Sequence, residues 1–282
     1  MKWIDSLFLF SMISIWILLV TNIILLFFGY TFSEDMQKRK LKKIKELSHY
    51  PMISIMIPSH NEEVVIYKTL LAMIKMNYPN DRYEIIVIND NSKDKTGEII
   101  ERVKSENPAS LINHVEVIGD RGGKGKSNAL NIGFQEANGE FLVIYDADNT
   151  PNAMALKYLL DEIMSNDNYG AVIGKFRTRN KNKNLLTKFI NIETLSFQWM
   201  AQAGRWKLFK LCTIPGTNFI IRRSIIEKIG GWDTEAVAED TEISFRIYEM
   251  GYKIAFMPLA ETFEQEPETI KVWMKQRSRW VN

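Results

Sequence analysis

The longest apolar stretch of the chain lies close to its N-terminus. From Leu7 to Tyr30 no residue carries a charge, and about 20 apolar residues are enough for a helix to cross a bilayer. A cleaved signal peptide has a shorter apolar core of about 7–15 residues and ends in small residues, whereas this stretch ends in Phe27-Phe28-Gly29-Tyr30. A buried helix of a soluble protein is disfavoured by the uninterrupted length. The pattern therefore predicts a transmembrane anchor over residues 1–31.

A basic segment follows the apolar stretch. Six of the eight residues at positions 38–45 are Lys or Arg, whereas the N-terminal side of the stretch carries only Lys2 and Asp5. Because positive charge is retained in the cytoplasm, residues 32–50 are predicted to be a cytosolic linker at the cell membrane, and the rest of the chain is predicted to be cytosolic. The basic residues can form a solvated helix face or contact anionic lipid headgroups, and both interpretations give the same orientation.

Beyond the linker, short apolar runs alternate with segments whose apolar residues recur at helical spacing. The runs predict strands at Ile53–Ile57, Tyr83–Ile88, Val115–Ile118, Phe141–Tyr145, Ala171–Phe176 and Phe219–Arg222. The other segments predict helices at Glu62–Lys75, Thr96–Ser105, Lys126–Ala137, Leu185–Ala203, Asp240–Met250 and Pro267–Trp280. Such alternation predicts an α/β domain over residues 51–282, with a mainly parallel sheet flanked by helices.

Composition narrows the class of function. The 282 residues include 36 basic and 34 acidic side chains, which give a net charge of +2. A charge this close to balance does not fit a dedicated nucleic-acid-binding protein, whose surface is much more basic. The single cysteine, Cys212, cannot form an internal disulfide, which fits a reducing compartment.

Polar residues follow several predicted strands, at the edge of the sheet where α/β proteins bind ligands. Asp146 and Asp148 follow the strand Phe141–Tyr145, and two carboxylates at this spacing can share a divalent cation, with Mg²⁺ or Mn²⁺ favoured by hard oxygen ligands. Such a tripeptide is also common in ordinary polar turns. Asp90 follows another strand and can hold the base or ribose of a nucleotide, or can cap a turn.

Two further segments lie at the starts of predicted helices. The glycine-rich turn Arg121–Lys126 can place Lys126 against a diphosphate, or it can be a flexible basic loop. Glu239 and Asp240 open another predicted helix. A carboxylate there can take a proton from an acceptor hydroxyl, or it can simply complement the helix dipole.

The last predicted helix carries Gln276-Arg277-Ser278-Arg279-Trp280. Arg279 can pair with phosphate, and Trp280 can stack on the face of a sugar. An amphipathic helix with an aromatic anchor is the alternative interpretation of the same residues.

In their order along the chain, these segments resemble the family 2 inverting glycosyltransferases, which have a Rossmann-like GT-A fold. The resemblance covers about Met52 to Trp280 and is strongest to the membrane-bound processive branch, which includes poly-N-acetylglucosamine, hyaluronan, chitin and cellulose synthases. The matching motifs are Pro58-Ser59-His60-Asn61-Glu62, Asn89-Asp90-Asn91-Ser92, Gly125-Lys126 with Ala129-Leu130-Asn131, Asp146-Ala147-Asp148, Glu239-Asp240 and Gln276-Arg277-Ser278-Arg279-Trp280. Two positions depart from the family pattern, Asn89 in place of an aspartate and Ala238 in place of a threonine.

The resemblance implies a role for each motif. Asp240, with Glu239, is expected to be catalytic as the general base, and Asp146 and Asp148 are expected to bind Mg²⁺ or Mn²⁺. The residues expected to bind the nucleotide sugar are Pro58, Asn61, Glu62, Asp90, Lys126, Asp146 and Arg279. The residues expected to bind the acceptor are Gln276 and Trp280.

The function implied by the resemblance is metal-dependent, inverting transfer of a sugar from a UDP-sugar, first choice UDP-N-acetylglucosamine, to a growing polysaccharide. The expected partners are the donor, a polysaccharide or lipid-linked acceptor, the membrane and accessory membrane subunits. Two alternatives stay open: a single-addition transferase acting on a lipid or protein, and a non-catalytic nucleotide-sugar-binding subunit. Related processive enzymes continue into further membrane helices after the last motif, so the domain is expected to be truncated before them.

Overall fold

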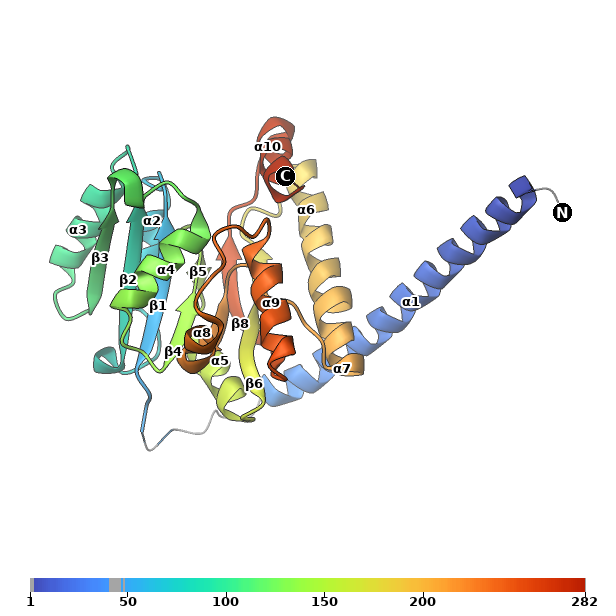
Figure 1. The fold of residues 1–282 in the computed structure, drawn as a ribbon, viewed down its shortest axis with the longest axis horizontal. Helices are drawn as coiled ribbons and strands as arrows, with labels where there is room; N and C mark the ends of the chain where they lie inside the picture. The colour runs from blue at the N-terminus through green and yellow to red at the C-terminus, as the bar shows by residue number, and fades with distance from the viewer. Residues whose placement is uncertain (1–2, 41–46, 48, 282) are drawn as a thin grey trace.

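The computed structural model describes residues 3–40, 47 and 49–281, with side chains through residue 278. A long N-terminal helix is attached to an α/β domain (Figure 1). The strands are β1 (Ile53–Ser59), β2 (Tyr83–Asp90), β3 (Ile112–Val117), β4 (Phe141–Ile144), β5 (Thr150–Pro151), β6 (Tyr169–Thr178), β7 (Phe219–Arg222) and β8 (Lys253–Glu264). The helices are α1 (Trp3–Lys40), α2 (Ile66–Ile74), α3 (Thr96–Glu106), α4 (Lys126–Glu136), α5 (Ala155–Met164), α6 (Leu185–Ser196), α7 (Arg205–Phe209), α8 (Arg223–Ile229), α9 (Glu239–Glu249) and α10 (Ile270–Val281). Two short 3₁₀ helices are η1 (Asn80–Arg82) and η2 (Gly119–Arg121), and a π-helical segment, η3 (Phe197–Gly204), joins α6 to α7.

The strands form one sheet in the order β3-β2-β1-β4-β7-β6-β8-β5. Strands β1 to β4 are parallel to one another, and β6 is parallel to β8. Strand β7 runs antiparallel to β4 and β6, and β5 runs antiparallel to β8. The predicted α/β fold with a mainly parallel sheet flanked by helices is therefore confirmed, with β7 and β5 as its antiparallel members.

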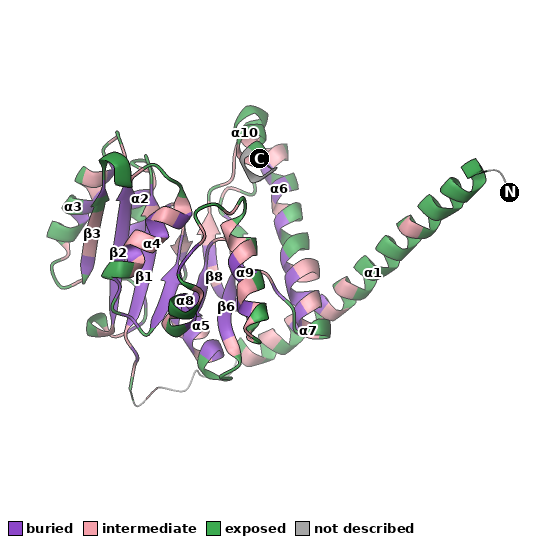
Figure 2. Cartoon of the chain, viewed as in Figure 1, coloured by how far each residue is buried: buried purple, intermediate pink, exposed green. Residues whose placement is uncertain are grey.

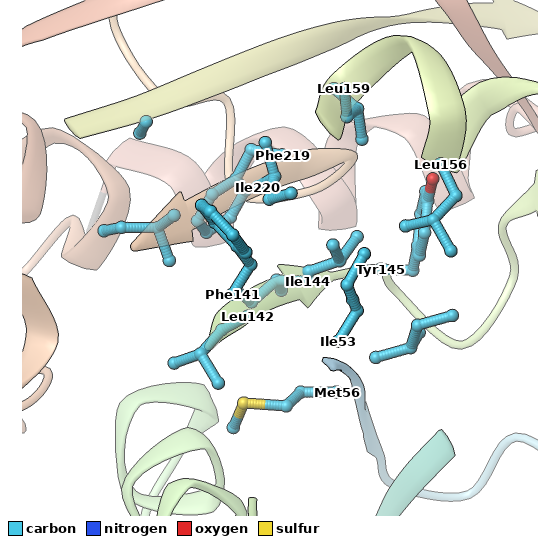
Figure 3. Close-up of a cluster of buried hydrophobic side chains, with 14 of the residues drawn as sticks. Ile53, Met56, Phe141, Leu142, Ile144, Tyr145, Leu156, Leu159, Phe219 and Ile220 are labelled. Carbon is cyan, nitrogen blue, oxygen red and sulfur yellow. The ribbon is translucent and has the colours of Figure 1, made fainter. Parts of the chain in front are cut away.

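The core lies between the sheet and the helices that cover both of its faces. Every residue of β2 and β4 is buried, which explains why these strands are continuous apolar runs rather than alternating ones. Figure 3 shows how Met56 from β1 and Leu142 and Ile144 from β4 pack together, with Leu156 and Leu159 of α5 on the other side of the strands. This close-packed centre fixes the strand ends that carry the polar loops.

The first half of the domain follows the predicted element boundaries closely. One difference is that α2 begins at Ile66 rather than at Glu62, because Glu62 to Val65 form a turn in which the Val65 N–H donates to the Glu62 carbonyl (3.0 Å). In the second half of the domain, the predicted helix Leu185–Ala203 is divided, because its hydrogen bonding becomes π-helical at Phe197.

The second half contains elements that were not predicted, namely α5, α7, α8, β5 and β8. Strand β8 is difficult to recognise because Pro258 interrupts it and cannot donate a ladder hydrogen bond. The pairing with β6 is irregular at this place: Ile173 pairs with Phe256, but Lys175 pairs with Glu261. The irregularity shifts the register of the strand end, so that Glu264 lies opposite Thr178.

Helix α1 has an exposed outer part and a docked inner part. Among the described residues it is long and apolar enough, by length and composition, to cross a membrane. Figure 2 shows that the part of α1 that projects from the domain is exposed along most of its length. The exposed surface of this part is therefore mostly apolar.

The inner part of α1 continues past residue 31 to Lys40 and packs on the domain. Phe32 is buried, and its ring stacks on Phe256 of β8 with the centroids 6.1 Å apart. A Cβ atom on Gly29 would overlap the Trp199 carbonyl of η3, so the two helices approach each other closely here. The predicted linker is thus helical over residues 32–40, and its residues 41–46 and 48 lie outside the described part of the chain.

Candidate active site

The loop after β1 and the turn after β2 are held together by hydrogen bonds. Asn61 adopts a left-handed conformation with φ 56°, and its backbone N–H donates to the Ser92 hydroxyl (2.9 Å). Its side-chain oxygen accepts from the Lys93 N–H (2.8 Å). Pro58 lies within β1, in register with Ile88 of β2. In the structure, Asn61 therefore joins the two loops that border the carboxyl ends of the parallel strands.

Asp90, the last residue of β2, holds the glycine-rich turn that follows β3. One of its carboxylate oxygens accepts from the Gly123 N–H (2.6 Å), and its backbone carbonyl is 2.6 Å from Nδ1 of His60. A Cβ atom on Gly122 would lie 2.9 Å from the Asp90 carboxylate and 2.7 Å from the Val117 carbonyl, so no side chain fits there. Asp90 thus orders the turn that leads to Lys126.

Lys126 is the first residue of α4 and connects three segments. Its amino group donates to the Asp146 carboxylate (2.6 Å) and to the Gly216 carbonyl (2.8 Å). Burial alone would lower the pKa of Lys126, but the Asp146 carboxylate, with Glu239 and Asp240 nearby, outweighs that effect and raises it. A permanently charged ammonium group is therefore fixed at the carboxyl end of β4.

Gly216 separates Lys126 from Asp240. A Cβ atom built on Gly216 would lie 3.6 Å from the Lys126 amino group and 3.5 Å from one oxygen of Asp240, whose other oxygen accepts from the Thr241 N–H (2.7 Å). Glycine is suited to this position because its φ is +84°. A proton acceptor and a cation therefore border the same small space.

Three carboxylates from two loops lie close enough to perturb one another. Burial and then Asp146 raise the pKa of Asp148. Burial, followed by Asp148 and Asp146, raises the pKa of Glu62 to about 7. Mutual repulsion of this kind fits a place where a cation is to be bound.

The donor set fits Mg²⁺ or Mn²⁺, because both prefer carboxylate oxygens. Within the ranges that the structure describes, no three His, Cys, Asp or Glu side chains are assembled into a ready metal cluster. Asp146 and Asp148 would hold such a cation together with ligands from outside the protein, and phosphate oxygens are the natural ones.

A further carboxylate, Glu264, reaches the same region from the end of β8. The buried Asn149 donates its side-chain amide to both Asp148 (3.1 Å) and Glu264 (3.4 Å), and its oxygen accepts from the Thr217 hydroxyl (3.0 Å). Burial, then Asp148 and Asp146, raise the pKa of Glu264 well above its usual value. The sequence analysis missed Glu264 because it missed β8, although the apolar run at positions 254–260 was a usable signal.

The region around α10 forms the outer side of the site. Gln276 lines an open pocket of about 520 Å³, whose other lining residues are Gln265, Glu266, Pro267, Glu268, Val272 and Lys275. Burial raises the pKa of Glu266, Arg277 opposes this, and Asp148 adds to it, so the pocket lies within electrostatic reach of the carboxylates. Arg279 and Trp280 lie on α10, but their side chains lie outside the described residues.

Comparison with solved structures identifies the fold. The chain superimposes on the mannosyltransferase PcManGT from Pyrobaculum calidifontis in complex with GDP-Man and Mn²⁺ with a TM-score of 0.68, over 93% of this chain and 73% of that one, at 22% identity. It also matches TarS from S. aureus in complex with UDP-GlcNAc, with a TM-score of 0.57 over 77% of this chain and 59% of that one, at 17% identity. The fold is therefore the GT-A fold of glycosyltransferases.

The chain belongs to glycosyl transferase family 2, whose family model matches residues 54–230. It is 52% identical over 277 residues to the probable glycosyltransferase YdaM of Bacillus subtilis (strain 168), and the alignment covers 98% of this chain and 66% of that protein. It is 32% identical over 253 residues to a poly-beta-1,6-N-acetyl-D-glucosamine synthase of Staphylococcus epidermidis, which covers 89% of this chain and 59% of that protein. The chain thus spans two thirds or less of the length of these curated relatives.

Proposed function

We propose that this chain is the catalytic part of a membrane-anchored, cation-dependent glycosyltransferase that builds a polysaccharide. In this proposal it transfers N-acetylglucosamine from UDP-N-acetylglucosamine to the growing chain and forms a β-glycosidic bond. The observation that carries the proposal is the arrangement around Gly216, where Lys126, paired with Asp146, and the Asp240 carboxylate border one space. A cation for the leaving group and a base for the acceptor are the two groups that such a transfer needs.

The reaction is a single displacement with inversion at the anomeric carbon. Asp240 accepts the proton of the acceptor hydroxyl while that oxygen forms a bond to the anomeric carbon. The bond from the anomeric carbon to the diphosphate oxygen breaks, and UDP leaves with its electron pair. Lys126 is placed to stabilise the negative charge that develops on the diphosphate. Glu239 adds negative charge at the start of α9 beside the base.

A bound Mg²⁺ or Mn²⁺ supplies further charge stabilisation to the departing diphosphate. Asp146 and Asp148 are the two residues that would hold this cation. Asn149 orients Asp148 by donating a hydrogen bond to its carboxylate. Asp90 and Asn61 shape the two loops at the nucleotide end of the site, and Glu62 projects toward Asp146 and Asp148. Pro58 lies in β1 just before this loop and is proposed to border the nucleotide sugar. Gln276, Arg279 and Trp280 on α10 are proposed for the acceptor and the phosphate.

The choice of donor is supported by the relatives. The synthase of S. epidermidis is named for poly-beta-1,6-N-acetyl-D-glucosamine, and the TarS structure holds UDP-GlcNAc. The PcManGT structure contains a different nucleotide sugar with Mn²⁺, which supports a cation in this fold more than a particular sugar. UDP-N-acetylglucosamine with Mn²⁺ or Mg²⁺ is therefore the first combination to test.

The proposed topology places residues 1–31 in the membrane and residues 51–282 on the cytosolic side. The exposed apolar part of α1 supports the anchor, and the basic segment that follows supports the orientation. The docked part of α1 holds the domain close to the bilayer, where a lipid-linked or polymeric acceptor and accessory membrane subunits can reach the site.

The experiment is a donor screen on membranes that contain the full chain. UDP release is measured across a panel of UDP-sugars with Mn²⁺, with Mg²⁺ and with EDTA, beside Asp240→Asn and the control Glu249→Gln. Glu249 is exposed at the far end of the same helix, so its variant is expected to behave like the unmodified protein. Cation-dependent release from UDP-N-acetylglucosamine that only Asp240→Asn loses is the expected result.

Other outcomes point to the alternatives. A product that carries one added sugar on a lipid or protein would replace polymer synthesis by single addition. Binding of UDP without turnover of any donor would favour a nucleotide-sugar-binding subunit. No cation-dependent binding of UDP would contradict the donor site itself.

A further inference from the structure

Glu264 differs from Glu84 and Glu261, two other partly or fully buried glutamates of the domain, in how its side chain is paired. Glu84 is held by the Ser54 hydroxyl (2.6 Å) and by the backbone N–H of Asn138 (2.7 Å), which is the pattern of a structural carboxylate. Glu261, on the same strand as Glu264, forms an ion pair with Lys175 (2.7 Å). Among the described residues, the hydrogen-bond partner of the Glu264 side chain is Asn149 alone, at 3.4 Å.

The position of Glu264 is nevertheless closely specified. The antiparallel pair Thr150↔Phe263 sets the end of β8 directly beside the segment that follows Asp148. Asn149 is fully buried and donates to Asp148 and Glu264 at once. The Thr217 hydroxyl, which donates to Asn149, accepts in turn from the Asp146 N–H (3.0 Å). The network therefore fixes Glu264 relative to both proposed cation ligands.

The acidic groups around this network outnumber the basic ones. Glu62, Asp146, Asp148 and Glu264 contribute four carboxylates. Within the described part of the chain, Lys126 pairs with Asp146. Arg179 lies near Asp148 and partly offsets the rise in the pKa of Asp148. A divalent cation is attracted to this group of carboxyl oxygens, and it can carry a nucleotide diphosphate with it, whereas the diphosphate alone gains no such attraction.

We infer that Glu264 is a specificity-determining residue that makes nucleotide diphosphate binding depend on a divalent cation. Its carboxylate attracts the cation that accompanies the diphosphate, so the site takes up the cation–diphosphate complex. Asn149 is the positioning residue that holds Glu264 and Asp148 at the distance this requires. The inference rests on the proposed donor site and adds a residue and a selection rule to it.

The experiment measures the dissociation constant of UDP by calorimetry, once with Mn²⁺ and once with EDTA. The ratio of the two constants is the coupling factor, and by linkage UDP raises the affinity for Mn²⁺ by the same factor. In Glu264→Gln, UDP is expected to bind more weakly than in the unmodified chain when Mn²⁺ is present and about as tightly when EDTA is present. The coupling factor is expected to fall about tenfold.

Glu261→Gln is the matched control, because it removes a carboxylate from the same strand but not from the network. The coupling factor of Glu261→Gln is expected to equal that of the unmodified chain. Glu264→Asp keeps a carboxylate at this position, so it is expected to recover most of the coupling factor that Glu264→Gln loses. A second measurement titrates Mn²⁺ alone and follows it by electron paramagnetic resonance, where Glu264→Gln is expected to weaken binding.

An unchanged coupling factor in Glu264→Gln would overturn the inference and leave Glu264 as a structural residue. An equal fall in Glu261→Gln would also overturn it, because the effect would then follow general charge rather than this position. Failure of the unmodified chain to bind UDP with Mn²⁺ would instead contradict the proposed donor site, so the two claims fail separately.

Discussion

The two halves of the sheet differ in regularity and in what they contribute to the site. Strands β1 to β4 are parallel, continuously apolar and joined by regular helices, and they carry the loops of Asp90, Lys126 and Asp146. Strands β6 to β8 mix directions, and β8 contains a register shift at Pro258. This half contributes Glu264, and the segment after β7 contributes Asp240. The regular half thus suits binding of the nucleotide, and the irregular half suits positioning of the reacting groups.

This difference predicts that substitutions in the two halves of the sheet affect UDP binding and sugar transfer differently. Substitutions at the ends of the parallel strands are expected to weaken UDP binding and slow transfer together. Substitutions in the second half, with the exception of those at Glu264, are expected to slow transfer while UDP binding is largely kept.

Apart from replacement of the proposed base Asp240, the largest effect is expected for Lys126→Ala. Removal of the ammonium group leaves Asp146 without its partner and the leaving diphosphate without a fixed cation. We expect kcat to fall by about 10²–10³-fold and UDP affinity to decrease as well. Steady-state UDP release and calorimetry measure the two quantities, with Lys104→Ala on the exposed end of α3 as the control. Normal turnover in Lys126→Ala would remove this residue from the site.

A smaller effect is expected for Gly216→Ala, which adds a methyl group between Lys126 and Asp240 and strains a residue with φ +84°. We expect kcat to fall by about 10–10²-fold, because the added methyl group displaces the reacting groups by up to about 1 Å. Gly251→Ala is a matched control, since Gly251 has φ +80° and open space around it. Equal losses in both variants would show that strain alone is responsible.

Asp90→Ala is expected to act mainly on binding. The variant loses the hydrogen bond that orders the glycine-rich turn, so UDP affinity should decrease about tenfold. The transfer rate at saturating donor should change less than in Gly216→Ala. A variant that binds UDP normally would indicate that Asp90 serves only the local fold of the turn.

The smallest effect concerns the pH dependence of stability without cation or nucleotide. The pKa of Glu62 is raised to about 7 in the folded chain from 4.5, so the folded state keeps its proton to higher pH than the unfolded state. Stability is therefore expected to decrease as pH rises from about 4.5 to about 7 and to level off above that. Asp148 and Glu264 shift in the same direction and add to the decrease.

Glu62→Gln is expected to remove part of this decrease and to melt at a higher temperature than the unmodified chain at pH 8. The gain is about 2–4 °C for each kcal/mol of repulsion that is removed. Thermal melts at pH 5 and pH 8 in EDTA measure it, and addition of Mn²⁺ with UDP should reduce the difference. A melting temperature that rises with pH in the unmodified chain would contradict the sign of the shift.

The regular half was largely readable from the sequence, because buried parallel strands are apolar runs and the polar residues that follow them lie at one edge. The predicted starts of β1, β2, β4, α3 and α4 agree with the structure. The π-helical turn at Phe197 and the close approach of Gly29 to Trp199 depend on tertiary packing, which local periodicity does not contain.

The candidate site was readable in part. Lys126, Asp146 and Asp240 were named from the sequence, and the structure brings them together. Glu264 and Asn149 were not named, because their role depends on the register of β8 and on a hydrogen bond between segments 115 residues apart. Such contacts can be identified only from a three-dimensional structure that shows the register of β8.

The central claim is that Asp240, in the irregular half, takes the proton of the acceptor hydroxyl while the regular half holds the nucleotide-sugar donor. The most direct test measures UDP affinity with Mn²⁺ and the rate of a single transfer in Asp240→Asn, beside Glu249→Gln. The account predicts UDP affinity within about threefold of the unmodified chain and a transfer rate lower by about 10²–10⁴-fold in Asp240→Asn alone. An undiminished transfer rate in Asp240→Asn, or a loss of UDP binding that fully explains a lower rate, would contradict it.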